Sequence, residues 1–118
     1  MDKNEAFVEE IAEGYKFEGE SIIMGAAKRG DEVYKELFVR IPLRTMNRHG
    51  LIAGATGTGK TKTLQIIAEQ LSEHGVPSLV MDIKGDLSGI AVESSGHEKI
   101  DERHDKIGLP FIASSSPV

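Results

Sequence analysis

The chain has 118 residues, enough for one domain, and its 39% hydrophobic and 28% charged residues describe an ordinary folded protein rather than a disordered one. It has no cysteine, which excludes disulfides and thiolate metal sites, and no apolar run approaches the roughly 18 residues of a membrane-spanning helix. Its formal net charge of −5 argues against nucleic-acid binding through overall charge. We therefore expect a cytoplasmic protein with no membrane partner.

The N-terminal third predicts a short helix and then a β-hairpin. Asp2 and Glu5 have the spacing of a capping box, and apolar residues at helical spacing predict a helix over 4–13 that ends at Gly14. Between 20 and 43, two strand-like segments flank a turn that contains Gly and Asp, which predicts a hairpin or a small β-layer.

Four basic residues lie at the end of this hairpin region: Arg40, Arg44, Arg48 and His49. Pro42 interrupts the stretch, so the arginines cannot form a stripe along one continuous helix. They are either solvated loop charges or a contact with DNA or a neighbouring subunit.

The most specific motif of the chain reads Gly54-Ala55-Thr56-Gly57-Thr58-Gly59-Lys60-Thr61. It fits the pattern G-x-x-x-x-G-K-[ST] of a loop that wraps a nucleoside triphosphate; the alternative is a glycine-rich turn that happens to contain Lys-Thr. Glycines let the backbone approach phosphate oxygens closely, so that successive N–H groups and the N-terminus of the following helix face the anion. Lys60 can reach the β- and γ-phosphates and the Thr61 hydroxyl can bind Mg²⁺, which makes these two the predicted catalytic residues.

The residues around this motif predict the order strand, loop, helix, strand. Residues 51–53 are an apolar run suited to a buried strand, apolar residues then recur at helical spacing up to Gly75, and 76–82 form a second apolar run. A further helix is expected over 97–107. The predicted fold class is α/β, a partial P-loop NTPase core of the RecA-like kind with parallel strands and helices.

The sequence divides into three expected regions. They are an N-terminal helix at 1–15, a β-hairpin or small β-layer at 16–45, and the N-terminal half of a P-loop NTPase domain at 46–118. Two strands make about half of such a sheet, which needs helices on both faces, so we expect a portion of a longer protein.

Acidic and histidine residues offer two candidate metal sites. Asp82 follows an apolar run and could join Thr61 in the Mg²⁺ shell, or it could order the adjacent loop as a hydrogen-bond acceptor. His97 and His104 flank three acidic residues, but the spacing gives no H-E-x-x-H, and a solvated helix face is the simpler interpretation.

Two segments carry a family resemblance, the one from Asn47 to Thr61 and the one from Asp82 to Gly89, which reads Asp-Ile-Lys-Gly-Asp-Leu-Ser-Gly. Together they resemble the bacterial HerA-like P-loop ATPases, relatives of the HerA and FtsK DNA motors. The resemblance covers roughly residues 18–118. It implies a RecA-like ATPase domain, ATP and Mg²⁺ as cofactors, a hexameric ring, and translocation on double-stranded DNA. The family's Walker B acid, water-orienting residue and trans-acting arginine are expected beyond Val118.

The resemblance also maps a nucleotide site onto the motif, with backbone donors from Thr58 and Lys62. The predicted nucleotide-binding residues are Gly54, Ala55, Thr56, Gly57, Thr58, Gly59, Lys60, Thr61 and Lys62.

Three functions compete at this point. The first is the ATP-binding part of a HerA-like ATPase that couples hydrolysis to DNA translocation, with the missing groups supplied by the rest of the protein and by neighbouring subunits. The second is a nucleotide-binding module without turnover, which describes the 118-residue chain alone better. The third is a small-molecule kinase or another P-loop enzyme, which would need a lid for the phosphate acceptor, and none is visible in the sequence.

Overall fold

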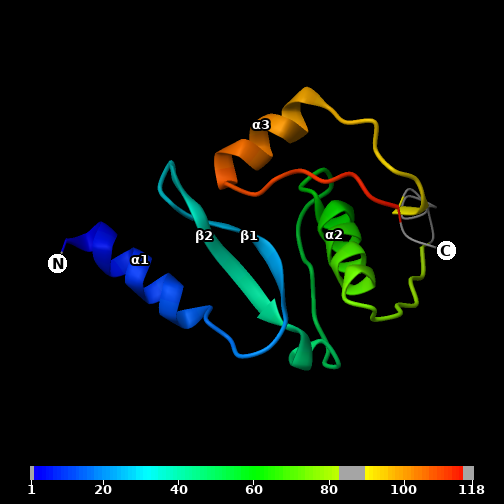
Figure 1. Cartoon of the computed structure of the whole chain (residues 1–118), viewed down its shortest axis with the longest axis horizontal. Helices are drawn as coiled ribbons and strands as arrows, with labels where there is room; N and C mark the ends of the chain where they lie inside the picture. The colour runs from blue at the N-terminus through cyan, green and yellow to red at the C-terminus, as the bar shows by residue number, and fades with distance from the viewer. Residues whose placement is uncertain (1, 83–89, 116–118) are drawn as a thin grey trace. The chain divides into compact units, whose positions relative to one another are not determined.

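The computed structural model of the chain describes residues 2–82 and 90–115. Its elements run in the order α1 (Lys3–Gly14), β1 (Ser21–Arg29), β2 (Glu32–Pro42), the 3-10 helix η1 (Leu43–Thr45), α2 (Lys60–Glu73) and α3 (Glu98–Ile107) (Figure 1). In this part of the chain, none of the helices is long and apolar enough to cross a membrane.

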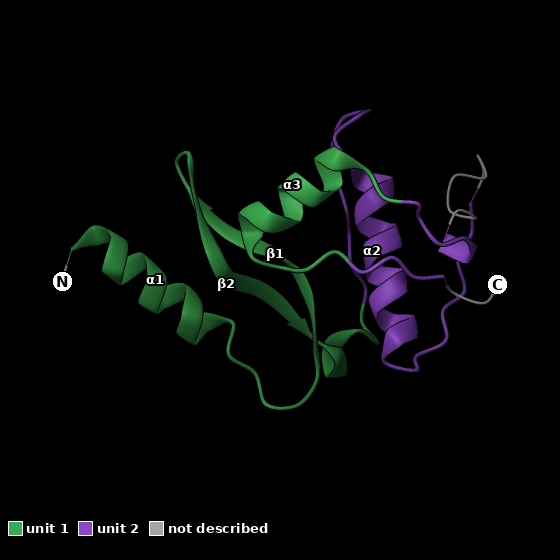
Figure 2. Ribbon diagram, turned by 45° about the horizontal axis from the view of Figure 1, so that its top comes forward, with its two compact units in different colours: residues 1–48, 96–111 green, residues 49–95, 112–118 purple. Residues whose placement is uncertain are grey.

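The chain forms two compact units, drawn in different colours in Figure 2. The first comprises residues 1–48 and 96–111, and the second comprises residues 49–95 and 112–118. The first unit is therefore discontinuous in sequence, because α3 returns to the hairpin after the whole phosphate-loop region.

The first unit is built on the predicted hairpin. β1 and β2 pair antiparallel, with Ser21 opposite Pro42 at one end and Arg29 opposite Glu32 at the other. Ile22 is fully buried, which places the core of this unit on the hairpin.

The helix α1 begins as the sequence predicts. The Asp2 carboxylate accepts hydrogen bonds from the N–H groups of Asn4 (2.7 Å) and Glu5 (2.8 Å), and the Glu5 carboxylate accepts one from the Asp2 N–H (3.2 Å). This reciprocal capping box satisfies N–H groups that the first turn of a helix leaves without partners. The helix packs on β2 through Phe7, whose ring centroid lies 5.2 Å from that of Tyr34.

The helix α3 packs against a bulge in β2. The hairpin register shifts between Ala26 and Lys28, and on the other strand Glu36 has a φ of 63° in the left-handed region. Gly108, the C-cap residue of α3, has a φ of 79°. A Cβ on Gly108 would lie 2.6 Å from the Lys35 Cγ, so only glycine fits there. A contact between residues more than 70 positions apart thus joins α3 to the hairpin.

The second unit contains α2, which ends as the sequence predicts. Gly75 has a φ of 75° and its N–H donates to the Ser72 carbonyl (2.9 Å), while the Val76 N–H donates to the Leu71 carbonyl (2.8 Å). These two bonds form a Schellman motif, which satisfies carbonyl groups at the helix C-terminus.

The predicted parallel sheet is wrong. Residues 51–55 and 76–82 have no regular secondary structure, and the one ladder among residues 2–82 and 90–115 is the antiparallel hairpin. The reason is physical: an apolar run becomes a parallel strand only when neighbouring strands pair with it and helices cover both faces. Here Leu51, Leu79 and Met81 are 89%, 94% and 89% exposed. The described residues therefore form a small α/β assembly, and they do not contain the RecA-like P-loop core expected for 46–118.

Candidate phosphate-binding site

The predicted phosphate loop is an exposed segment that leads directly into α2. Gly57 and Gly59 have φ values of 81° and 97°, a region that other residues rarely adopt. The loop is closed by Thr58, whose N–H (3.3 Å) and hydroxyl (2.6 Å) both donate to the Ala55 carbonyl. Helix α2 begins at Lys60, directly after Gly59.

The Lys60 side chain folds back over this loop. Its Nζ donates hydrogen bonds to the carbonyl oxygens of Gly54 and Ala55, the latter at 2.9 Å. The ammonium group therefore lies at the loop that it is predicted to serve, held by neutral acceptors. A phosphate oxygen would be a stronger partner, because its negative charge adds an electrostatic attraction to the ammonium that a neutral carbonyl oxygen lacks.

The two neighbouring residues are placed differently. The Thr61 side chain is exposed, and in the described part of the chain its hydroxyl makes no hydrogen bond, so it is available to a ligand. The Lys62 Nζ donates to the Gln65 side chain at 3.4 Å, pointing along the helix rather than into the loop. This arrangement fits a role for Lys62 through its backbone N–H.

The N-terminus of α2 differs from those of the other two helices. α1 is capped by the Asp2 side chain and α3 by the His97 side chain, and both helices carry acidic residues in the first turn. The N-cap residue of α2 is Gly59, which provides no side-chain cap, and the first turn of the helix contains Lys60 and Lys62 but no acidic residue. Cations at the positive end of a helix dipole are unfavourable by about 0.3–1 kcal/mol each. An anion bound at this end would relieve that repulsion and accept hydrogen bonds from the free N–H groups.

The sequence motif predicts that the N-terminus of the following helix faces the anion, and the structure adds that no side chain caps this N-terminus. The signal was present, because the sequence puts two lysines and no acid in the first turn after a glycine. The motif alone does not show that the N-terminus of α2 lacks a side-chain cap.

Asp82, the candidate metal ligand, lies at the end of an exposed segment and takes part in an interaction of its own. Within residues 2–82 and 90–115, no group of three or more His, Asp or Glu side chains is placed to hold a metal ion. The Mg²⁺ roles of Thr61 and Asp82 stay predictions. Of the second segment of the resemblance, residues 83–89 lie outside the described residues.

The two histidines of the C-terminal helix have structural roles. The His97 Nδ1 accepts a hydrogen bond from the Lys99 N–H (3.1 Å) as the N-cap of α3. The His104 Nδ1 donates to the Leu109 carbonyl (3.0 Å), and its ring meets that of Phe111 edge-on with centroids 5.3 Å apart. They stabilise the two ends of α3.

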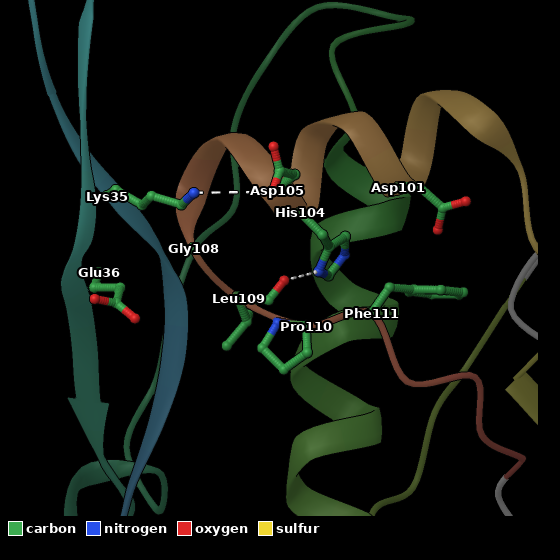
Figure 3. A pocket seen from close by; sticks show the side chains of 9 residues that line it. All are labelled: Lys35, Glu36, Asp101, His104, Asp105, Gly108, Leu109, Pro110 and Phe111. Carbon is green, nitrogen blue, oxygen red and sulfur yellow. Dashed lines mark hydrogen bonds and ion pairs between the residues drawn. The ribbon is translucent and has the colours of Figure 1, made fainter.

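A pocket of about 410 Å³ lies in the first unit between α3 and β2 (Figure 3). Its walls carry both signs of charge, with the Lys35 Nζ 3.8 Å from the Asp105 carboxylate across an exposed ion pair. The His104 ring lies beside Phe111 and is bonded to Leu109. Lys35 is paired with Asp105, and His104 with Leu109, so we interpret the pocket as an incompletely packed contact between α3 and the hairpin.

Comparisons with known proteins place the chain in a family. Residues 28–118, which are 91 of the 118 residues, match the family described as Helicase HerA-like C-terminal. The chain is 31% identical over 62 residues to the DNA double-strand break repair helicase HerA of Saccharolobus solfataricus, and 34% identical over 62 residues to the protein of the same name from Sulfolobus acidocaldarius. Each alignment covers 52% of this chain and 12% of the relative. No solved structure matches.

The matched region contains the candidate site at residues 54–62, α2 and α3 together with β2. It includes most of the chain and leaves out α1 and all but the last two residues of β1. The chain therefore belongs to the family of HerA-like helicase C-terminal regions.

Proposed function

We propose that residues 54–62 bind the phosphates of ATP together with Mg²⁺. The observation that supports this most strongly is the N-terminus of α2, which has two lysines, no acidic residue and no side-chain cap, next to a loop with two left-handed glycines. A structural turn gains nothing from that combination, whereas an anion there is stabilised by backbone N–H groups, the helix dipole and Lys60.

Each residue has a role that fits its geometry. Gly57 and Gly59 allow the backbone turn that exposes the N–H groups of the loop. Lys60 exchanges its carbonyl partners for the β- and γ-phosphate oxygens, and Thr61 offers its unpaired hydroxyl to Mg²⁺. Mg²⁺ suits this site because it is commonly held by few protein ligands plus phosphate oxygens and water.

For the whole protein we propose a role in which ATP hydrolysis drives movement on DNA, in a ring of six subunits. Two relatives are named as DNA double-strand break repair helicases, which supports DNA as the substrate. The aligned segment covers 12% of each relative, so most of the machinery of such an enzyme corresponds to sequence outside the alignment.

For the 118-residue chain alone, binding without turnover is the better proposal. Residues 37–68, which surround the phosphate loop, contain no Asp or Glu. A carboxylate that holds Mg²⁺ or orients the attacking water must therefore come from outside residues 37–68, either from Asp82 or from the rest of the protein. An arginine supplied by a neighbouring subunit is worth about 10³–10⁵ in rate, so its absence would leave hydrolysis very slow.

Calorimetric titration with ATP and Mg²⁺ tests whether the chain binds ATP. A phosphate-release assay on the same samples then tests whether it hydrolyses ATP. We expect the chain to bind ATP and to release no phosphate above background. Lys60→Ala should abolish binding, whereas Lys62→Ala should retain it because the backbone N–H remains. Absence of binding by the unaltered chain, or equal loss in both variants, would overturn the assignment of the loop.

A further inference from the structure

The charges of the chain are strongly segregated along the sequence. The segment from Leu37 to Ala68 contains five of the 14 Lys and Arg residues and none of the 19 Asp and Glu residues. Lys60 and Lys62 of this segment belong to the phosphate loop. The other three, Arg40, Arg44 and Arg48, lie outside this loop. A net charge of −5 for the whole chain conceals this local excess of positive charge.

Local structure holds two of these arginines on one compact segment. Leu43 is anchored by its N–H, which donates to the Glu20 carbonyl at 3.0 Å. Two successive turns follow, closed by the Met46 N–H to the Leu43 carbonyl (3.0 Å) and by the Arg48 N–H to the Thr45 carbonyl (3.3 Å). Arg44 lies within the first turn and Arg48 ends the second, so both are presented by a short, hydrogen-bonded segment rather than by a loose loop.

Arg40 lies near the end of β2, four residues before Arg44 in the sequence. It lies opposite Ile23 in the hairpin, and its guanidinium lies 5.5 Å from the centroid of the Phe38 ring. That contact orients the side chain without neutralising its charge. Arg44 and Arg48 are exposed, and Arg40 is half-buried.

The three arginines have no charged partner in the part of the chain that the structure describes. Among residues 2–82 and 90–115 no carboxylate forms an ion pair with any of them, although Glu20 bonds to this segment through its backbone. In the same unit, by contrast, Lys35 does have an acidic partner in Asp105. Guanidinium groups without a counter-ion on an anchored segment are suited to phosphates, which they can bind through two parallel hydrogen bonds.

We propose that Arg40, Arg44 and Arg48 contact the phosphate backbone of DNA without reading its sequence. This inference rests on the proposed function, in which the whole protein acts on DNA, and it places a DNA contact next to the ATP-binding loop in the sequence. We assign the contact to phosphates rather than to base edges. Arginines that bind phosphates position a protein on DNA and carry no sequence information.

Fluorescence anisotropy with a short labelled DNA duplex of mixed sequence, without nucleotide, tests the proposal. The variant Arg44→Gln/Arg48→Gln is compared with Lys99→Gln/Arg103→Gln, which removes the same charge from the exposed surface of α3. We expect the first variant to bind roughly tenfold more weakly and to lower the slope of log affinity against log salt by about 1.8 between about 50 and about 200 mM salt. We expect the α3 variant to bind like the unaltered chain.

Equal losses of DNA affinity in the two double variants would overturn the proposal. DNA binding would then depend on the net charge of the chain and not on these arginines. An unchanged affinity together with a change in sedimentation of the Arg44/Arg48 variant would also overturn it and assign the arginines to a protein interface. ATP binding of this variant should stay unchanged. Loss of ATP binding in Lys60→Ala with unchanged DNA binding in Arg44→Gln/Arg48→Gln would refute this inference and leave the proposed function intact.

Discussion

Gly54 and Thr58 meet across the phosphate loop so closely that a Cβ on Gly54 would lie 2.6 Å from the Thr58 Oγ1. That hydroxyl donates to the Ala55 carbonyl at 2.6 Å, and the carbonyl also accepts from the Lys60 Nζ. The Ala55 carbonyl thus accepts both the hydrogen bond that closes the loop and the one that positions Lys60. A side chain at position 54 would disturb the first of these bonds. The first glycine is required here by a close contact, since its φ is not in the left-handed region, whereas Gly57 and Gly59 are required by their φ values.

Gly54→Ala should weaken ATP binding about two- to tenfold, because the new methyl group displaces the Thr58 hydroxyl and a hydrogen bond contributes about 0.5–1.5 kcal/mol. Gly50→Ala is the matched control, since a Cβ at Gly50 meets nothing within 4 Å and its φ is not in the left-handed region. Calorimetric titration with ATP and Mg²⁺ measures both. Identical affinities for the two variants would show that the close contact has no bearing on binding.

Thr61→Ala should reduce the Mg²⁺ dependence of ATP binding and leave Mg²⁺-independent binding nearly unchanged, because it removes the unpaired hydroxyl and keeps the backbone N–H. Thr61→Ser should restore the Mg²⁺ effect, since serine keeps a hydroxyl at the same position. The measurement is ATP affinity across a Mg²⁺ titration. If alanine behaves like threonine at every Mg²⁺ concentration, Thr61 is not a metal ligand.

Gly108→Ala should destabilise the first unit by about 2–4 kcal/mol, combining about 1–2 kcal/mol for a left-handed residue with the cost of overpacking. The added Cβ would lie 2.7 Å from the Glu36 Cγ and 3.1 Å from the Glu36 backbone nitrogen, which cannot move aside easily. Gly14→Ala is the control, because its Cβ has open space. Urea unfolding followed by circular dichroism checks the difference, and equal midpoints would contradict the packing of α3 on β2.

The pKa of Tyr34 predicts how the stability of the fold changes at alkaline pH. Its pKa is raised above the ordinary 10.0, first by burial and then by the Glu32 carboxylate, which repels the phenolate and accepts the hydroxyl hydrogen at 3.3 Å. A raised folded-state pKa means that the native state holds this proton more tightly. Its contribution to stability is thus complete below pH 10.0 and is lost as the pH rises through the raised value.

Ultraviolet titration of a Tyr15→Phe background, in which Tyr34 is the remaining tyrosine, measures this pKa directly. Glu32→Gln should lower it toward 10.0, whereas Glu102→Gln on the exposed surface of α3 should leave it unchanged. An unchanged titration in Glu32→Gln would show that the neighbouring carboxylate does not control Tyr34.

Elements whose signals are local could be predicted from the sequence. The capping box of α1, the hairpin turn and the glycine ends of α2 and α3 are all read from residues a few positions apart. The sheet could not be predicted in this way, because pairing depends on partners elsewhere. Residues 76–82 have the apolar composition of a buried strand, yet no strand in the described residues pairs with them.

The contact between α3 and β2 shows a second limit. From 33 to 41 every second residue of β2 is apolar except Lys35, and this break in the alternation lies next to the bulge around Glu36. Nothing local indicates that Gly108 packs onto this bulge. For the candidate site, the motif predicted which residues form the loop, and the structure added the bare N-terminus of α2 and the position of Lys60.

Above all, we propose that the bare N-terminus of α2 holds the phosphates of ATP. Amide chemical shifts of isotope-labelled protein during titration with ATP and Mg²⁺ test it most directly, because each N–H reports on its own environment. We predict that the largest shifts occur at the amides of Gly57 to Lys62 and disappear in Lys60→Ala. Large shifts at the capped N-terminus of α3, or no shifts at residues 57–62 at saturating ATP, would contradict the claim.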